Sequence, residues 1–260
     1  MPKIDILMEG YPFQTSVGII GFCGVFLVEG GGKRVLVDTA HVGRRTYMQA
    51  QMEARGLKPS DIDAVVMTHA HWDHIQNWDV FDHAPILFHR DEWRYSQRPH
   101  RNDWATPVWT GDSFRQARVQ EVEEGYEIIP GCRVVDLPGH SPGSIGVEVE
   151  TDGGLAIITG DALHFASVAL TGQNPLVFWD EQQARDSIKR VVQRADVIYP
   201  GHDQAFRVVN GKIEYVSKFE VTLTALGPDT PGLSFQPNFV RQIWIMPGIE
   251  QQAELLKASR

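Results

Sequence analysis

The stretch THAHWDH, residues 68–74, places three histidines and an aspartate in one short turn. It directly follows residues 64–67 (AVVM), an apolar run typical of a buried strand. Histidine and aspartate are poor core residues, so crowding them against a strand makes sense mainly when a cation collects them. The alternative is a polar loop with chance histidines, and the rest of the sequence must decide between the two.

Further downstream, polar residues again stand directly after strand-like apolar segments. These segments and the residues that follow them are 133–137 (RVVDL) with His140, the hairpin pattern 145–159 with Asp161, and 196–199 (DVIY) with His202. Glycine or Pro-Gly precedes each of these three residues, which predicts tight turns that present the side chains without long loops.

The remaining periodicity predicts alternating strands and helices. Residues 24–39 are typical of two strands joined by a glycine-rich turn, and residues 43–57 and 181–195 have helical spacing. No low-complexity linker or fixed-period repeat divides the chain, so we expect residues 1–260 to form a single domain.

If these strands share sheets and their ends point the same way, the polar residues converge. Imidazole and carboxylate groups suit borderline cations such as zinc, and seven candidates are enough for two metal ions. The seven are His69, His71, Asp73, His74, His140, Asp161 and His202.

The net charge and the apolar content of the sequence limit the classes of partner that the protein is expected to bind. The net charge is −9 and the basic residues are scattered, so nucleic acid is a disfavoured partner. No stretch approaches the roughly 20 apolar residues of a membrane span, and the first residues lack the regions of a secretory signal, so we expect a cytoplasmic protein. Cys23 and Cys132 have no CxxC spacing, and Cys23 is interpreted as a small core residue.

The ordered motifs LVDT (36–39), THAHWDH (68–74), PGH (138–140), TGD (159–161) and PGH (200–202) resemble those of the metallo-β-lactamase-fold hydrolases, over about residues 20–210. The resemblance implies an α+β fold, the αββα four-layer sandwich of the metallo-β-lactamase type, with a two-metal site at one edge.

Carried over position by position, the resemblance implies a role for each candidate. His69, His71 and His140 would bind the first metal, whereas Asp73, His74 and His202 would bind the second. Asp161 would bridge the two ions. Asp38 would orient the site by hydrogen bonding without binding metal itself; a plain turn aspartate is the alternative.

The chemistry implied is hydrolysis. Two metals can share a water, lower its pKa toward neutrality and so provide a bridging hydroxide as nucleophile, while Asp73 or Asp161 carries a proton to the leaving group. Asp161 as a bridging carboxylate is typical of lactonase, thioesterase and phosphodiesterase branches. Hydrolysis of a lactone or ester is therefore the favoured reaction. However, acyl-homoserine lactonases usually have a tyrosine where this chain has His164. His164 either replaces that donor or only packs at the rim.

Two stretches are candidate walls of a substrate pocket. Residues 92–114 contain Trp93, Tyr95, Trp104 and Trp109 with little periodicity, and a structural or dimer-packing loop is the alternative. Residues 165–179, beginning at Phe165, directly follow the bridging aspartate. The last fifty residues give no site signal.

The sequence therefore predicts a metal-dependent hydrolase of a small carbonyl substrate. A phosphodiesterase or nuclease of the same fold and a non-catalytic metal-binding protein remain as alternatives. Zinc is the default metal by resemblance, with manganese, iron or cobalt as the other choices. The expected partner is a small molecule rather than nucleic acid or a membrane, and homodimerisation stays open.

Overall fold

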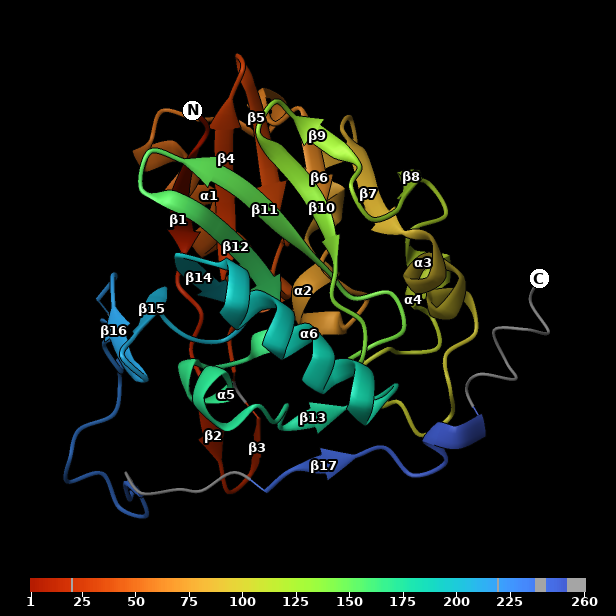
Figure 1. Ribbon diagram of the computed structural model, residues 1–260. Helices are drawn as coiled ribbons and strands as arrows, with labels where there is room; N and C mark the ends of the chain where they lie inside the picture. Colours follow the sequence, from red (N-terminus) through yellow and green to blue (C-terminus); the bar gives the residue numbers. More distant parts are fainter. Residues whose placement is uncertain (20, 219, 237–241, 252–260) are drawn as a thin grey trace.

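The computed structural model describes residues 1–19, 21–218, 220–236 and 242–251. Most strands belong to two mixed sheets that lie face to face (Figure 1). The first sheet contains, in spatial order, β1 (Lys3–Met8), β4 (Val25–Gly30), β5 (Lys33–Val37), β6 (Ala64–Val66), β7 (Pro85–His89) and β8 (Arg118–Val122).

The second sheet is built from the later part of the chain. Its strands, in spatial order, are β16 (Lys212–Tyr215), β15 (Phe206–Val209), β14 (Val197–Pro200), β12 (Gly154–Gly160), β11 (Ile145–Thr151), β10 (Cys132–Asp136) and β9 (Glu127–Ile129). Two small strand pairs lie outside these sheets: β2 (Gln14–Thr15) with β3 (Gly18–Ile19), and β13 (Leu176–Val177) with β17 (Trp244–Ile245).

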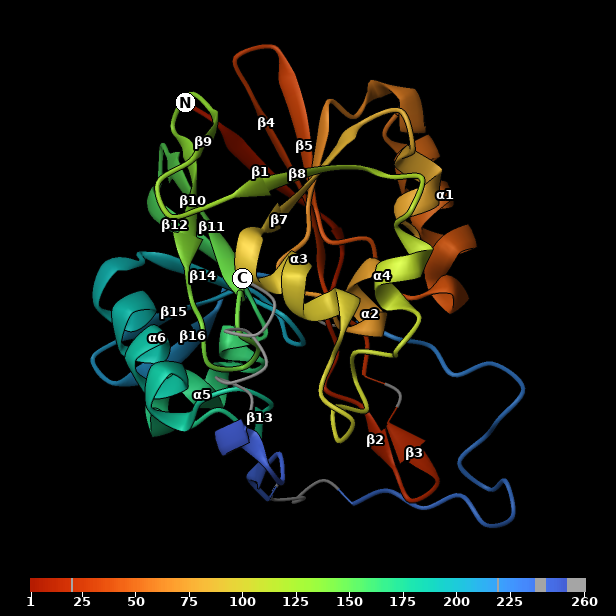
Figure 2. The same cartoon turned by 90° about the vertical axis from the view of Figure 1, so that its right-hand side faces the viewer.

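Helices cover both outer faces of the paired sheets, as Figure 2 shows with α1 on one side and α5 and α6 on the other. The α-helices are α1 (Arg45–Ala54), α2 (Trp72–Ile75), α3 (Arg90–Gln97), α4 (Thr110–Ser113), α5 (Ala166–Thr171) and α6 (Glu181–Arg194). Short 3₁₀ turns are η1 (Val42–Arg44), η2 (Pro59–Asp61), η3 (Trp78–Phe81), η4 (Asp161–Leu163) and η5 (Ile249–Gln251).

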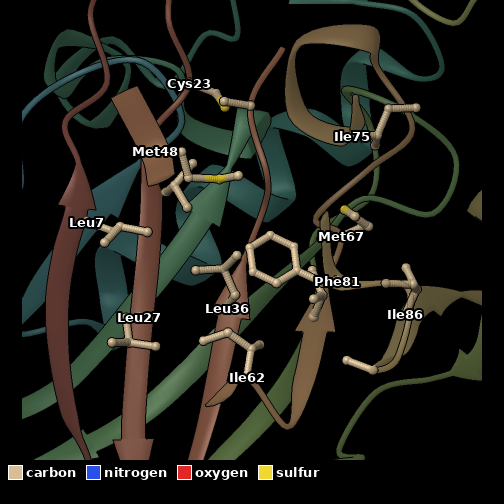
Figure 3. Packing of buried hydrophobic residues seen from close by; sticks show 14 of the residues in the cluster. Leu7, Cys23, Leu27, Leu36, Met48, Ile62, Met67, Ile75, Phe81 and Ile86 are labelled. Atoms are coloured by element: carbon tan, nitrogen blue, oxygen red, sulfur yellow. The ribbon is translucent and has the colours of Figure 1, made fainter. Parts of the chain in front are cut away.

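The strands are apolar on both faces because each sheet packs against the other sheet on one face and against helices on the other. In β4, Phe26 and Val28 join the core between the sheets, whereas Val25 and Leu27 join the core beneath α1. Figure 3 shows the core beneath α1, where Leu36 lies beside Phe81, and Leu27 and Met48 belong to the same cluster. A third core lies between the second sheet and helices α5 and α6. The layers therefore follow directly from the two-residue alternation of each strand.

The expected αββα sandwich is confirmed, and the expected elements agree with the observed ones to within a few residues. The helix expected over 43–57 is α1 preceded by η1, and the helix expected over 181–195 is α6. Among the described residues, no helix is long and apolar enough to cross a membrane.

Strand direction brings the candidate residues to one edge. β5 runs parallel to β6, and β12 runs parallel to β14. β10 is antiparallel to β11, which is antiparallel to β12, so β10, β12 and β14 all point the same way. At that end a 2.9 Å hydrogen bond from Ile145 N to Thr68 O joins the two sheets, so the loops after these strands meet.

Candidate metal centre

The seven candidate ligands lie together at this edge of the sandwich. They come from the loop after β6 and from α2, and from the segments that follow β10, β12 and β14. Their nitrogen and oxygen atoms form overlapping groups whose members lie within 4.8 Å of one another. We call His69, His71 and His140 site 1, and Asp73, His74 and His202 site 2.

Hydrogen bonds turn a ring nitrogen of each of two histidines toward the centre. His140 Nδ1 lies 2.7 Å from the carbonyl oxygen of Leu176 and must donate to it. His74 Nδ1 likewise donates to Asp38 Oδ2 at 2.8 Å. A neutral imidazole carries one proton, so in the neutral form either ring would keep the lone pair on Nε2, the atom that faces the centre.

Asp38 lies at the base of the site and receives three hydrogen bonds. Its Oδ1 accepts from Thr68 N, and its Oδ2 accepts from Thr68 Oγ1 and His74 Nδ1, each at 2.8 Å. Since the Thr68 hydroxyl donates to Asp38, it accepts from His69 Nδ1 at 3.0 Å. Asp38 thereby fixes His74 directly and His69 through Thr68.

His71 faces the centre through Nδ1, whereas His74 and His140 face it through Nε2. Its Nδ1 lies 2.9 Å from His140 Nε2, and its Nε2 lies 4.0 Å from Asp103 Oδ1. Asp103 is itself held by Tyr95 Oη at 2.9 Å and by the backbone N–H groups of Ala105 and Thr106.

Asp161 lies between the two sites. Its Oδ1 is 3.3 Å from Nε2 of both His74 and His202, whereas its Oδ2 is 3.6 Å from His140 Nε2. One oxygen therefore faces site 2 and the other faces site 1. Asp73 completes site 2, with its Oδ2 3.3 Å from His202 Nε2.

These residues fit divalent cations. Within the described part of the chain, the buried Nε2 atoms of His69 and His74 and the Oδ1 of Asp161 have no hydrogen-bond partner, which would be costly without a cation. Burial and the neighbouring His74 and His71 hold the pKa of His69 well below its usual value, so this ring is neutral and able to ligate.

Two further pKa shifts describe the field at the centre. Burial lowers the pKa of His71 to about 3, which also leaves that ring neutral. Burial disfavours the charged form of His74 as well, but the surrounding negative groups, including Asp161 and Asp38, raise its pKa well above the usual value. The centre thus attracts positive charge, which a metal ion would supply.

A cavity of about 520 Å³, counting its open mouth, lies over the centre. Its floor contains His71, Asp73, His140, Asp161, His164 and His202. Its walls are Pro12, Gly21, Trp72, Trp104, Ala105, Phe165, Leu176 and Phe178. No lysine or arginine is among these described lining residues.

His164 lies on the cavity floor, buried against the candidate ligands. Its Nε2 is 2.8 Å from Asp161 Oδ2, and its ring stacks on His202 with centroids 5.7 Å apart. Its nitrogen also groups with His140 and Asp161 as a potential ligand atom. The ring therefore lines the cavity beside the candidate ligands.

Three of the five expected pocket residues lie elsewhere. Trp93 packs in the core against Phe88 and Phe114, because its side chain points from α3 back toward the first sheet. Tyr95 is buried and bonded to Asp103. Trp109 precedes α4, is half exposed and is not among the described residues that line the cavity. Their assignment to the pocket is corrected; Trp104 and Phe165 do line it.

Other wall residues had weaker signals in the sequence. Trp72 lies inside the opening motif itself, and Phe178 lies in the second stretch expected to form a wall. The last fifty residues also contribute, although they gave no site signal. Trp244 packs on Phe178 and Trp104, with centroids 4.9 and 5.9 Å away, and so supports the wall from behind.

The sequence is similar to those of known proteins. The family model of the metallo-beta-lactamase superfamily matches residues 19–202. Metallo-beta-lactamase domain-containing protein 1 of Xenopus laevis is 32% identical over 208 residues, covering 80% of this chain and 82% of that protein. An N-acyl homoserine lactonase of Bacillus cereus is 29% identical over 153 residues, covering 57% and 58%.

A solved structure supports the fold. The crystal structure of a Bacillus thuringiensis AiiA mutant, with N-decanoyl-L-homoserine bound at its active site, superposes with a TM-score of 0.62 at 21% identity, covering 78% of this chain and 92% of that one. The family match over most of the chain, together with the sequence relatives, shows that the protein belongs to the metallo-beta-lactamase superfamily and is a metal-dependent hydrolase.

Proposed function

We propose that this hydrolase uses two divalent metal ions, zinc by default, to hydrolyse a small neutral lactone or ester. The observation that carries the proposal is the placement of Asp161, whose two carboxylate oxygens face different ligand groups beneath a cavity whose described lining contains no lysine or arginine. A carboxylate in that position suits a bridge between two ions.

Site 1 and site 2 would each hold one ion. His69, His71 and His140 offer three neutral nitrogens to the first, and Asp73, His74 and His202 offer a carboxylate and two nitrogens to the second. When bound, such ions supply Lewis acidity and lower the pKa of water toward neutrality. Asp38 keeps the lone pairs of His69 and His74 turned inward.

The chain's own groups handle protons beside the reacting carbonyl. Asp73 lines the cavity and is the more accessible carboxylate of the cluster, so it can pass a proton to a leaving alkoxide. His164 faces the same space with Nε2 near Asp161 and can donate to a developing oxyanion. The aromatic walls limit access of bulk water to these groups.

The walls favour an apolar substituent over a polyanion. Trp72, Trp104, Phe165, Leu176 and Phe178 offer apolar surface, and burial of apolar area contributes about 25 cal/mol per Å². A phosphodiester would find no cationic side chain among the described lining residues. The relatives include N-acyl homoserine lactonases, which are named for lactones that carry an acyl chain.

A substrate panel tests the proposal. We expect lactones, thioesters and aryl esters to be hydrolysed with higher kcat/KM than bis-p-nitrophenyl phosphate, and we expect chelation to abolish the activity. Phosphodiester cleavage without carbonyl hydrolysis would refute the substrate assignment.

A further inference from the structure

Glu92 is a fully buried acid in the first turn of α3, with 0% of its surface exposed. An ionisable side chain that deep in a protein needs specific partners, because burial without them is strongly destabilising. Burial raises the pKa of Glu92 to about 7, whereas its hydrogen bonds to Ala70, Ser141 and Gly143 act in the opposite direction.

The partners of Glu92 come from two different loops. Its Oε1 accepts from Ala70 N at 2.8 Å. Its Oε2 accepts from Gly143 N and from Ser141 Oγ, both also at 2.8 Å. One carboxylate therefore ties residues 69–71 to residues 140–144 across a gap in sequence of about seventy residues.

These two loops carry all of site 1. Ala70 lies between His69 and His71, and Ser141 directly follows His140. The bond to Ala70 N fixes the backbone from which both neighbouring imidazoles project, and the bonds to Ser141 and Gly143 fix the loop that presents His140. Within the described residues, the Glu92 carboxylate forms no hydrogen bond to any of the three histidine rings.

Tight packing leaves the arrangement little freedom. A Cβ added to Gly143 would lie 2.3 Å from Glu92 N and 2.7 Å from Glu92 Cβ, so only glycine lets this loop approach α3 so closely. The side chain of Ser141 is further held by Ser144, with the two hydroxyl oxygens 2.7 Å apart. The start of α3 is thus a fixed platform for both ligand loops.

We propose that Glu92 is the positioning residue of site 1, setting the spacing between His69, His71 and His140 through the two loops that it joins. The proposal rests on the proposed metal-binding function of these histidines. Among the hydrogen bonds of the described residues, none joins α3 to Asp73, His74 or His202, so loss of Glu92 acts selectively on the first ion.

The test compares metal binding in Glu92→Gln and in a matched control. Gln keeps the size of the side chain but replaces one acceptor oxygen by an NH₂ donor, which then faces an N–H or O–H donor. We expect one of two Zn²⁺ ions to bind 10–100-fold more weakly, by competition with a chromophoric chelator. The d–d absorption of the Co²⁺-loaded protein should also lose intensity for one ion.

Glu148→Gln is the control, because Glu148 is also a buried glutamate but pairs with Arg194 on α6, away from the centre. It should lower Tm without weakening either ion. Equal metal affinities in Glu92→Gln and Glu148→Gln would overturn the proposal.

Ser141→Ala gives a milder variant should Glu92→Gln not fold, since it removes one of the three bonds and retains the carboxylate. We expect site 1 to weaken severalfold, and unchanged affinity there would overturn the proposal too. Wild-type protein that binds two ions but hydrolyses no carbonyl substrate would refute the proposed function alone.

Discussion

Replacing Asp38 by asparagine changes one atom at the base of the site. Asp38 has φ of 61°, a left-handed conformation that asparagine tolerates well, so the backbone need not move. If the remaining oxygen accepts from Thr68 N, the new NH₂ group faces the Thr68 hydroxyl and His74 Nδ1. To accept from that NH₂, His74 must shift its proton to Nε2, the atom that faces site 2.

The expected cost follows from that tautomer change. Loss of a carboxylate that orients a metal-binding histidine weakens metal affinity by about 10–100-fold, or roughly 1.4–2.8 kcal/mol. Asp38→Asn should therefore still bind two ions but less tightly, with activity recovering as metal is added.

Competition with a chromophoric chelator measures the affinity, and circular dichroism checks the fold. The control is Asp63→Asn, which removes a surface ion pair with Lys33 worth about 0.2–1 kcal/mol and lies away from the site. Wild-type metal affinity and activity in Asp38→Asn would show that Asp38 is only a turn residue.

Three further predictions test the site, its walls and the core. A Cβ at Gly201 would lie 2.0 Å from Asp161 Oδ1, so Gly201→Ala should displace that carboxylate and lower both metal affinity and kcat at least about tenfold. Gly227→Ala is the control and should behave as wild type, because a Cβ at Gly227 has open space around it. A Gly201→Ala variant as active as wild type would contradict the geometry. Trp104→Ala should raise KM more than it lowers kcat, because Trp104 lines the cavity. Trp93→Ala should instead lower the free energy of unfolding by up to about 3 kcal/mol, because Trp93 packs in the core. A raised KM with unchanged stability in Trp93→Ala would show that Trp93 belongs to the pocket. Burial raises the pKa of both cysteine thiols to about 12, so neither should react with a thiol reagent at pH 8 until the protein is unfolded, and rapid labelling of the native protein would count against the packing.

Much of the fold and of the ligand set could be predicted because both depend on local patterns. The strands alternate or run apolar, and residues such as His140 and His202 stand directly after them in Pro-Gly turns. Parallel strand direction then places such residues at one edge, and the structure brings the seven candidates together there.

The cavity walls and the supporting residues could not be predicted in the same way. Pro12, Gly21 and Phe178 meet only in the folded chain, so no sequence window contains their arrangement. Trp93 belongs to an aromatic-rich stretch, but the direction of its side chain from α3 decides that it packs in the core. Glu92 has the appearance of an ordinary acid at a helix start, and only the tertiary contacts bury it.

The metal content of active protein tests the central claim most directly. Elemental analysis of protein purified without added metal, combined with hydrolysis assays during chelation and reloading, counts the ions that activity requires. The account predicts two divalent ions per chain, with carbonyl hydrolysis lost on their removal and regained on their return. One ion per chain in fully active protein, or full activity after complete removal of metal, would contradict it.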